Sequence, residues 1–351
     1  MHPAAGGHRG SRPRRPTGAG PITGYDIIGD IHGSADKLTG LLDVLGYRVV
    51  DGAHRHRDRT AVFVGDLMDR GPRQVEVVET VRAMHEAGSA LVILGNHEFN
   101  ALSYATPDPG SPGDFARAHL GRRGAHNTRQ HQAYLDQVVE GSARHRAHLA
   151  WFRTLPLHLD LGGIRVAHAC WHPASLAVLD KWVPPGSPLT DTFVVEANTR
   201  GTEAFDAVEV VLKGPELRLP PELAWIDPEG TLRHAARLRW WDDTARTARE
   251  VGLIPPDSRT PDGSPHPGLP DTVSDVVEEY RYRGDVPVFF GHYWFTGPPA
   301  PAARHAVCVD YSAARPGCSL VAYRWNGESV STADRFVAFP GPAAGPAGAL
   351  T

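Results

Sequence analysis

The chain has 351 residues, 41% of them hydrophobic, and a formal net charge of −4. A charge this close to balance excludes a strong field toward nucleic acid or a membrane surface, and no apolar stretch approaches the roughly 18 residues of a spanning helix. Three cysteines without framework spacing favour a reducing compartment over a secreted disulfide protein. We therefore expect a cytoplasmic protein that needs neither membrane nor nucleic acid; its oligomeric state stays open.

Both ends of the chain are rich in Gly, Pro and Ala and offer little to bury. Residues 1–21, a basic segment, and residues 338–351 are therefore expected to be disordered tails. Between them we expect one domain, residues 22–337. It should contain a helical insertion at about 100–160 and a variable region at about 175–285 that forms a cap and decides specificity.

The domain begins with alternating strands and helices. Apolar runs that end in polar residues predict strands; they lie at 25–28, 60–64, 90–94, 163–170 and 286–290. Helical spacing of apolar residues follows the first two runs, which indicates a largely parallel sheet beneath helices. Farther on, Asn326-Gly327 between alternating residues predicts an antiparallel hairpin.

Each of these strands ends in residues that can bind a metal ion. They are Asp30 and His32 in "GDIHG", Asp66 in "GDLMDRG", Asn96 in "GNHE", His168 in "AHAC" and His292 in "GHYW". Side chains two positions apart in an extended chain face the same way, so Asp30 and His32 should face one spot. In open α/β sheets ligands bind beyond the carboxyl ends of the strands, so we expect all of these side chains at one edge.

The donors are oxygen and imidazole atoms without any thiolate, a set that suits Mn²⁺, Fe or Zn²⁺. We expect Mn²⁺. Six ligands are too many for one catalytic ion but suit two ions about 3.5–4 Å apart that share one carboxylate. Asp66 is the expected bridge, because ligands from both neighbouring strands flank it, and Asp30 and His32 should hold the first ion. The second ion should be held by the remaining donors, Asn96, His168 and His292.

The motifs "GDIHG", "GDLMDRG" and "GNHE", in this order, resemble the calcineurin-like metallophosphoesterases. Within them the chain resembles the phosphoprotein-phosphatase branch, which includes bacterial diadenosine-tetraphosphate hydrolases. The resemblance covers roughly residues 24–335, most densely 25–100. It implies an α/β or α+β fold: a β-sandwich of two mixed sheets flanked by helices in four αββα layers. Trp294 stands where many members outside this branch have a second histidine.

A phosphoryl group in transfer spreads negative charge over its oxygens, so catalysis is mainly positioning and electrostatics. Two cations would bind these oxygens and turn water into the attacking hydroxide. Arg70 should fork to the phosphate, and the "NTRG" stretch resembles one that brings a second phosphate-binding arginine, here Arg200. His97, beside a ligand, is the expected general acid, and Asp69 should orient it.

Two segments fit more than one role. "HNTRQHQ" at 126–132 suits a lid or a plain solvated helix. "RLRWWDD" at 237–243 mixes basic and aromatic residues, a pattern also found where nucleic-acid bases stack; a packed strand or a wall of the substrate pocket is the simpler expectation.

The leading prediction is a dinuclear metal-dependent phosphoesterase, a phosphomonoesterase of the protein Ser/Thr phosphatase kind. The alternatives are a dinucleoside polyphosphate hydrolase, acting for example on diadenosine tetraphosphate, and a phosphatase of nucleic-acid ends. A hypothesis of a different class is a non-catalytic binding protein on a degenerate scaffold, but degeneration removes ligands and here every ligand position is filled. The expected partner is a phosphorylated small molecule, nucleotide or protein.

Overall fold

The computed structural model describes residues 24–340 except 228–229, 256 and 274. The tail predicted at 1–21 lies outside the described residues, as does 341–351 of the second tail. Residues 338–340 are not a tail: they belong to strand β16 (Phe336–Pro340), which pairs antiparallel with β15 (Ser319–Trp325). Phe339 packs so closely on Gly40 that a Cβ there would lie 2.3 Å from its ring.

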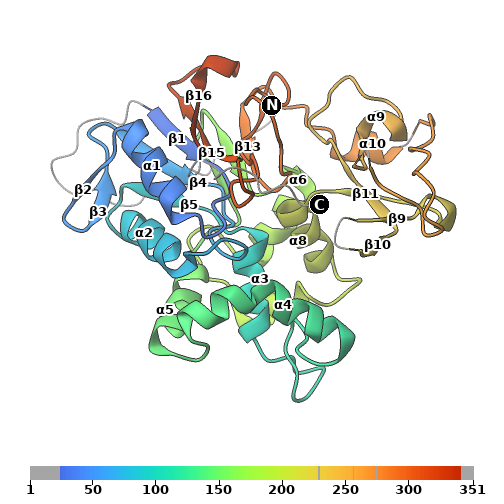
Figure 1. The fold of residues 1–351 in the computed structure, drawn as a ribbon, viewed down its shortest axis with the longest axis horizontal. Helices are drawn as coiled ribbons and strands as arrows, with labels where there is room; N and C mark the ends of the chain where they lie inside the picture. Colours follow the sequence, from blue (N-terminus) through green and yellow to red (C-terminus); the bar gives the residue numbers. More distant parts are fainter. Residues whose placement is uncertain (1–23, 228–229, 256, 274, 341–351) are drawn as a thin grey trace, which may run out of the picture.

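One mixed sheet holds the N-terminal strands. The sheet has five strands in the order β16-β15-β1-β4-β5. β1 spans Gly24–Ile28, β4 spans Arg59–Phe63 and β5 spans Ala90–Val92. β1, β4 and β5 are parallel, whereas β15 runs antiparallel to β1. Helices α1 (Ala35–Leu45) and α2 (Gln74–Glu86) lie beside this sheet (Figure 1). The predicted strand-then-helix units are therefore confirmed.

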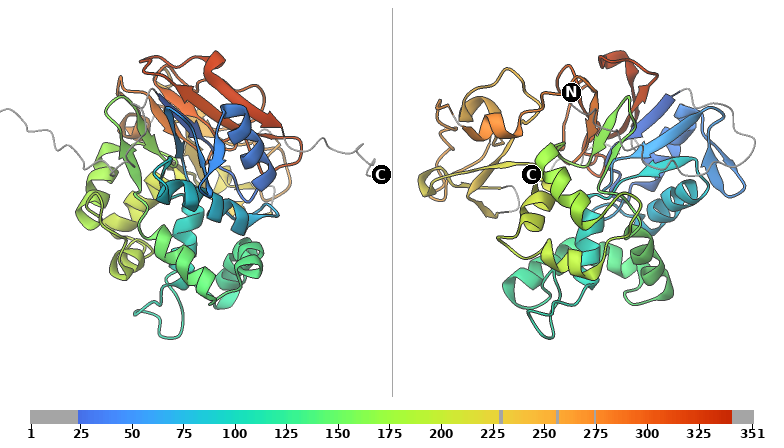
Figure 2. Two further views of the ribbon diagram at one scale, coloured as in Figure 1. Left: turned by 90° about the vertical axis from the view of Figure 1, so that its left-hand side faces the viewer. Right: turned by 180° about the vertical axis from the view of Figure 1, so that it is seen from behind.

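A second mixed sheet packs against the first. It has the order β14-β13-β7-β6, with β14 at Ala306–Cys308, β13 at Val288–Phe290, β7 at Arg165–Ala167 and β6 at His158–Asp160. Ile27 and Val62 of the first sheet, with Ile93 directly after β5, meet Val166 and Phe289 of the second sheet, and all are fully buried. Each such side chain contributes about 1.5–3 kcal/mol, and the result is the predicted two-sheet sandwich, seen side-on in Figure 2.

Most of the region at about 100–160 is helical. α3 (Asn96–Ala105), α4 (Gly121–Val138) and α5 (Ala143–Phe152) form it and lie together at the bottom of Figure 1. Further helices follow: α6 (Pro173–Trp182), α7 (Asp191–Glu196) and α8 (Glu203–Lys213).

A small lobe with its own core comes next, at the right of Figure 1. Its strands are β8 (Glu216–Arg218), β9 (Trp225–Ile226), β10 (Leu232–Arg233), β11 (Ala235–Leu238) and β12 (Gly252–Leu253). Its helices are η1 (Pro221–Leu223), α9 (Ala248–Val251) and α10 (Asp275–Tyr280). Leu219, Trp225 and Ala236 are buried together, apart from the main core. The region predicted as a cap thus contains an independently packed unit.

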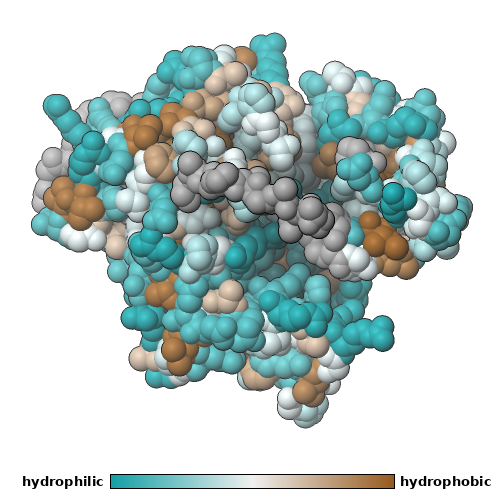
Figure 3. All heavy atoms as spheres, in the orientation of Figure 1, coloured by the Kyte–Doolittle hydropathy of each residue, from teal (hydrophilic) through white to brown (hydrophobic). Residues whose placement is uncertain are grey.

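The antiparallel pair of β2 (Arg48–Val50) and β3 (Ala53–Arg55) and the short helix η2 (Ala333–Arg335) complete the described fold. The hairpin predicted at Asn326-Gly327 exists, but its connection is longer than a two-residue turn: β15 ends at Trp325 and β16 begins at Phe336. Within the described residues, no helix combines the length and the apolar character needed to cross a membrane. Hydrophilic side chains predominate on the face drawn in Figure 3.

Candidate metal centre

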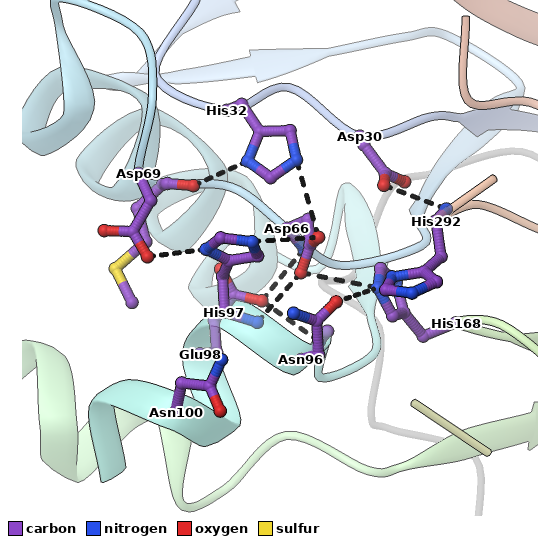
Figure 4. A network of polar contacts seen from close by, with 12 residues as sticks. Asp30, His32, Asp66, Asp69, Asn96, His97, Glu98, Asn100, His168 and His292 are labelled. Carbon is purple, nitrogen blue, oxygen red and sulfur yellow. Dashed lines mark hydrogen bonds and ion pairs between the residues drawn. The ribbon is translucent and has the colours of Figure 1, made fainter. Parts of the chain in front are cut away.

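The strand ends of both sheets meet at one place. Asp30 and His32 follow β1, and Asp66 follows β4. Asn96 begins α3 after β5, while His168 follows β7 and His292 follows β13; Figure 4 shows these side chains gathered around Asp66. All of the residues predicted as ligands are at least nine-tenths buried. The structure therefore brings together side chains that lie as far apart in the chain as Asp30 and His292.

The backbone at these positions is strained. His32, Asp66 and His292 have φ angles of 46°, 51° and 71°, in a region that costs a residue with a side chain roughly 1–3 kcal/mol. Two glycines permit close approach: a Cβ would lie 2.3 Å from Asp66 Oδ1 at Gly95 and 2.0 Å from Asp30 Oδ1 at Gly291. Strain of this kind persists where the surrounding structure enforces it, typically at functional sites.

Asp66 lies between two groups of donors. Its Oδ2 is 3.5 Å from His32 Nε2, and its Oδ1 is 3.4 Å from His168 Nε2. The potential ligand atoms of His32, Asp66 and His97 all lie within 4.8 Å of one another, and so do those of Asp66, His168 and His292. A carboxylate that belongs to two such groups can bridge two cations.

Backbone carbonyls set the tautomers of two histidines. His32 Nδ1 lies 2.8 Å from Met68 O, and His168 Nδ1 lies 2.7 Å from Val64 O. A carbonyl only accepts hydrogen bonds, so Nδ1 is the donor in each ring and Nε2 is the ring atom that faces Asp66. Metal-binding histidines are oriented by this same kind of outer contact.

Several buried atoms in the group lack hydrogen-bond partners within the described chain, among them Asp30 Oδ1, His32 Nε2 and both ring nitrogens of His292. Orphaned buried polar atoms are costly, and a cation would satisfy them. Asn96 Oδ1 lies 3.0 Å from His168 Nε2, and donors about 2.1 Å from one ion lie roughly 3–3.5 Å apart. These residues therefore fit divalent metal ions.

The charges in the cluster perturb one another strongly. Burial, and then the nearby carboxylates of Asp310 and Asp66, raise the pKa of Asp30 well above its usual range. Burial acts in the same direction on Asp66, but His168 and His97 outweigh it and hold the pKa of Asp66 well below its usual range. A site that crowds carboxylates in this way favours a positively charged occupant.

His97 and Asp69 form the predicted pair. Asp69 Oδ2 is 2.6 Å from His97 Nδ1. His97 is the least buried member of its group, with 12% of its side chain exposed. Burial opposes the charged ring, but the carboxylates of Asp66 and Asp69 raise the pKa of His97 above its usual value. Asp69 has a second partner that the sequence did not suggest, His131 of α4, with Nδ1 3.0 Å from Oδ1.

Arg70 follows Asp69 in the turn after β4, and its guanidinium carbon is 4.2 Å from the centre of the Trp294 ring. Its phosphate contact stays a prediction. Arg200 lies in the turn after α7, with its guanidinium carbon 5.6 Å from the centre of the Phe205 ring. Among the described residues, no contact joins Arg200 to the ligand cluster, and its predicted role stays a prediction.

Sequence reasoning missed Arg237 of β11, which lies in the "RLRWWDD" segment. Its positive charge, after burial itself, lowers the pKa of His292, and it also repels Arg70. Within the described residues, its guanidinium has no hydrogen bond or ion pair. The carboxylate of Glu216, on the paired strand, acts on Arg237 without forming an ion pair. A half-buried cation that makes no direct ion pair, beside a cluster of ligands, is suited to an anionic substrate.

Glu98, the last residue of "GNHE", was also missed. Its carboxylate is fully buried and accepts hydrogen bonds from the backbone N–H groups of Gly95, Asp66 and Leu67 at 2.8–3.0 Å. Burial, and then the charge of Asp66, raise the pKa of Glu98 to about 7. This residue joins the turn after β4 to the start of α3 and so fixes the backbone that carries Asp66.

A sandwich of two mixed sheets with oxygen and imidazole donors at its strand ends has the architecture of a metallophosphoesterase. The sequence profile described as calcineurin-like phosphoesterase matches residues 25–293. The chain therefore belongs to the calcineurin-like phosphoesterase family, and the resemblance read from its motifs is confirmed.

Among curated relatives, the asymmetrical bis(5'-nucleosyl)-tetraphosphatase of Bacillus velezensis is 46% identical over 86 residues, which is 24% of this chain and 34% of the relative. The symmetrical bis(5'-nucleosyl)-tetraphosphatase of Aromatoleum aromaticum is 34% identical over 143 residues, 40% of this chain and 42% of the relative. The chain thus matches well under half of the length of these relatives.

Among solved structures, a protein serine/threonine phosphatase from Saccharomyces cerevisiae aligns with 93% of this chain and 81% of its own, at 14% identity and a TM-score of 0.46.

Proposed function

We propose that the chain is a metal-dependent phosphoesterase that hydrolyses dinucleoside polyphosphates. The observation that supports this most is the convergence of two groups of metal-type donors on Asp66, with the unpaired cation of Arg237 beside them. Of the substrate classes that the sequence left open, this one is also named in the curated relatives, rather than the phosphoproteins of the leading prediction.

The residues that would hold two divalent ions, Mn²⁺ in the first instance, are those predicted. Asp66 would bridge, Asp30 and His32 would hold one ion, and Asn96, His168 and His292 would hold the other. His32 shares its group of potential ligand atoms with His97 and Asp66, and His168 and His292 share theirs with Asp66. Asp30 is assigned from its buried Oδ1, which has no hydrogen-bond partner within the described residues, and Asn96 from its contact with His168. Bound ions of this kind polarise phosphoryl oxygens and lower the pKa of water. The protein would contribute a buried site, histidine rings oriented by backbone carbonyls, and ligands held in fixed positions.

Two arginines would bind the phosphate chain. Arg70 and Arg237 carry like charges that repel each other, and neither has an ion-pair partner among the described residues. A phosphate between them would remove this repulsion, and Trp294 beneath Arg70 limits the directions in which its guanidinium can point. Because Arg237 comes from the small lobe, we propose that the region at about 175–285 forms part of the specificity wall.

His97 would give a proton to the leaving oxygen. Its Nδ1 is held by Asp69, so Nε2 is the atom left to face substrate, on the solvent side of the cluster. The carboxylates around the ring favour its protonated form, as a general acid requires.

The test is a substrate comparison with the purified chain, stripped with a chelator and reloaded with Mn²⁺. Diadenosine tetraphosphate, a phosphoserine peptide and p-nitrophenyl phosphate are compared by product analysis. We expect the dinucleotide to be preferred in kcat/KM by about tenfold to a hundredfold, because each extra charge-assisted phosphate contact contributes about 1.5–3 kcal/mol. Asp66→Asn should abolish turnover of all three.

Variants separate the arginines. Arg237→Met should raise KM for the dinucleotide, whereas Arg218→Met, an exposed arginine on the neighbouring strand β8, should not. Arg200→Met decides whether the arginine predicted from sequence also contributes. Preference for the phosphopeptide would overturn the proposed substrate class. No turnover with Mn²⁺, Fe²⁺ or Zn²⁺ would favour the binding-protein hypothesis instead.

A further inference from the structure

We propose that His131, in helix α4 of the insertion, is a positioning residue that holds the Asp69 carboxylate in the orientation needed to aim His97. The inference rests on the proposed function, in which His97 protonates the leaving oxygen. It assigns to the "HNTRQHQ" segment a role that the sequence left open.

The geometry is a carboxylate held at both oxygens. Asp69 Oδ2 meets His97 Nδ1 at 2.6 Å, and Asp69 Oδ1 meets His131 Nδ1 at 3.0 Å. Asp69 and His131 are both more than nine-tenths buried, so water does not compete for these contacts. The Asp69 backbone N–H is itself held by Gln74 Oε1 at 2.8 Å.

The two histidines contribute differently. His131 Nε2 is buried and has no hydrogen-bond partner within the described residues. Asp69 only accepts, so Nδ1 of His131 is the donor of this hydrogen bond. His131 thus orients the carboxylate through Oδ1, while Oδ2 stays available to His97. The shorter contact to His97 fits a charge-assisted bond.

The second contact matters because the carboxylate torsion of an aspartate is broad and roughly two-fold. With His97 as its only partner, the Asp69 carboxylate would rotate and His97 would tilt with it. A misplacement of about 1 Å at a reacting group costs about a hundredfold in rate. His131 removes this freedom.

Helix α4 can serve as an anchor because it is fixed to the same turn. Gln137, farther along α4, accepts a hydrogen bond from the Gln74 N–H and donates one to Pro72 O, both at 2.8 Å. His131 itself packs between the rings of Tyr104 and Tyr134, whose centres lie 5.5 and 5.1 Å from its own. The segment is therefore a docked amphipathic helix, and neither a mobile lid nor a fully solvated helix is needed to explain it.

The test is a double-mutant cycle on the Mn²⁺-loaded full chain with diadenosine tetraphosphate. His97→Ala should lower kcat by about 10²–10⁴-fold, the usual contribution of a general acid. His131→Phe should lower kcat by about tenfold to a hundredfold and leave KM and bound manganese within twofold. In the double variant the further loss beyond His97→Ala should be under about threefold, since residues that act as one unit are not additive.

Conservative variants provide a rescue. Asn places its amide N–H near Nδ1 of a histidine, whereas Gln places it near Nε2, so His131→Asn should recover most of kcat and His131→Gln should not. His148→Phe is the matched control: His148 is buried in α5 and bonded to the Tyr134 hydroxyl at 2.9 Å, away from Asp69. It should leave kcat within twofold.

The outcomes are distinguishable. If the wild type turns over substrate, three results overturn the role of His131 alone. They are additive losses of kcat in the His97 and His131 double variant, equal kcat for His131→Asn and His131→Gln, and loss of manganese from both of these variants. Absence of wild-type turnover overturns the proposed function and this inference together. If His131→Phe does not fold, the Asn and Gln pair decides the question.

Discussion

Replacing Glu98 by Gln tests how the backbone under Asp66 is held. Oε2 of Glu98 accepts the N–H groups of Asp66 and Gly95, and Oε1 accepts that of Leu67. A glutamine has one oxygen, so its best orientation keeps the first two bonds and turns its NH₂ toward the Leu67 N–H. One buried donor then loses its acceptor, at a cost of about 1–3 kcal/mol.

The same reasoning applied to Glu98→Ala leaves three buried N–H groups without partners, or roughly 3–9 kcal/mol. A typical domain has only about 5–15 kcal/mol of stability in total, so this variant should be largely unfolded or should lose its metal centre. Urea unfolding of the chelator-treated protein, followed by circular dichroism, measures both variants, and bound manganese is measured after reloading.

The control is Glu76→Gln, where an exposed carboxylate pairs with Arg73 and the expected change is under about 0.5 kcal/mol. If Glu98→Gln unfolds at the same urea concentration as the wild type, three buried donors are satisfied in some other way and the proposed role of this carboxylate is wrong.

Three further variants address the ligands and the phosphate contacts. Gly291→Ala would place a Cβ 2.0 Å from Asp30 Oδ1, so we expect weaker manganese binding in a titration followed by calorimetry; unchanged affinity would show that Asp30 is not a ligand. Trp294→Ala removes the ring beneath Arg70, whose centre is 4.2 Å from the guanidinium carbon. It should raise KM for the dinucleotide about twofold to thirtyfold, given the roughly 0.5–2 kcal/mol of such contacts; an unchanged KM would mean that Arg70 is oriented by other groups. Arg237→Lys keeps the charge but loses the planar fork, so it should recover part of the KM lost in Arg237→Met, and full recovery would argue against bidentate binding.

The order of the motifs was informative because each one is local. An apolar strand followed by Asp, His or Asn places that residue at a strand end whatever the rest of the chain does. The sequence therefore predicted the strands that precede Asp30, Asp66 and Asn96. It also predicted that these strands end at one edge of the sheet. The tautomers of His32 and His168 were not, since they depend on carbonyls of Met68 and Val64, the second of which lies 104 residues from its histidine.

The sequence by itself determined the strands and the donor set at their ends, because strand periodicity and short motifs specify these through neighbouring residues. The two-sheet sandwich was implied by the resemblance of those motifs to a known family, and the His97–Asp69 pair was predicted beside them. Only the tertiary structure decided which side chains of the insertion and of the small lobe reach the centre. His131 lies 62 residues from Asp69, and Arg237 comes from a separately packed unit. The position of His131 and Arg237 relative to the ligand cluster depends on how helices and loops pack on the sandwich. This packing joins surfaces that are distant in the chain, so no periodic pattern in the sequence predicts it.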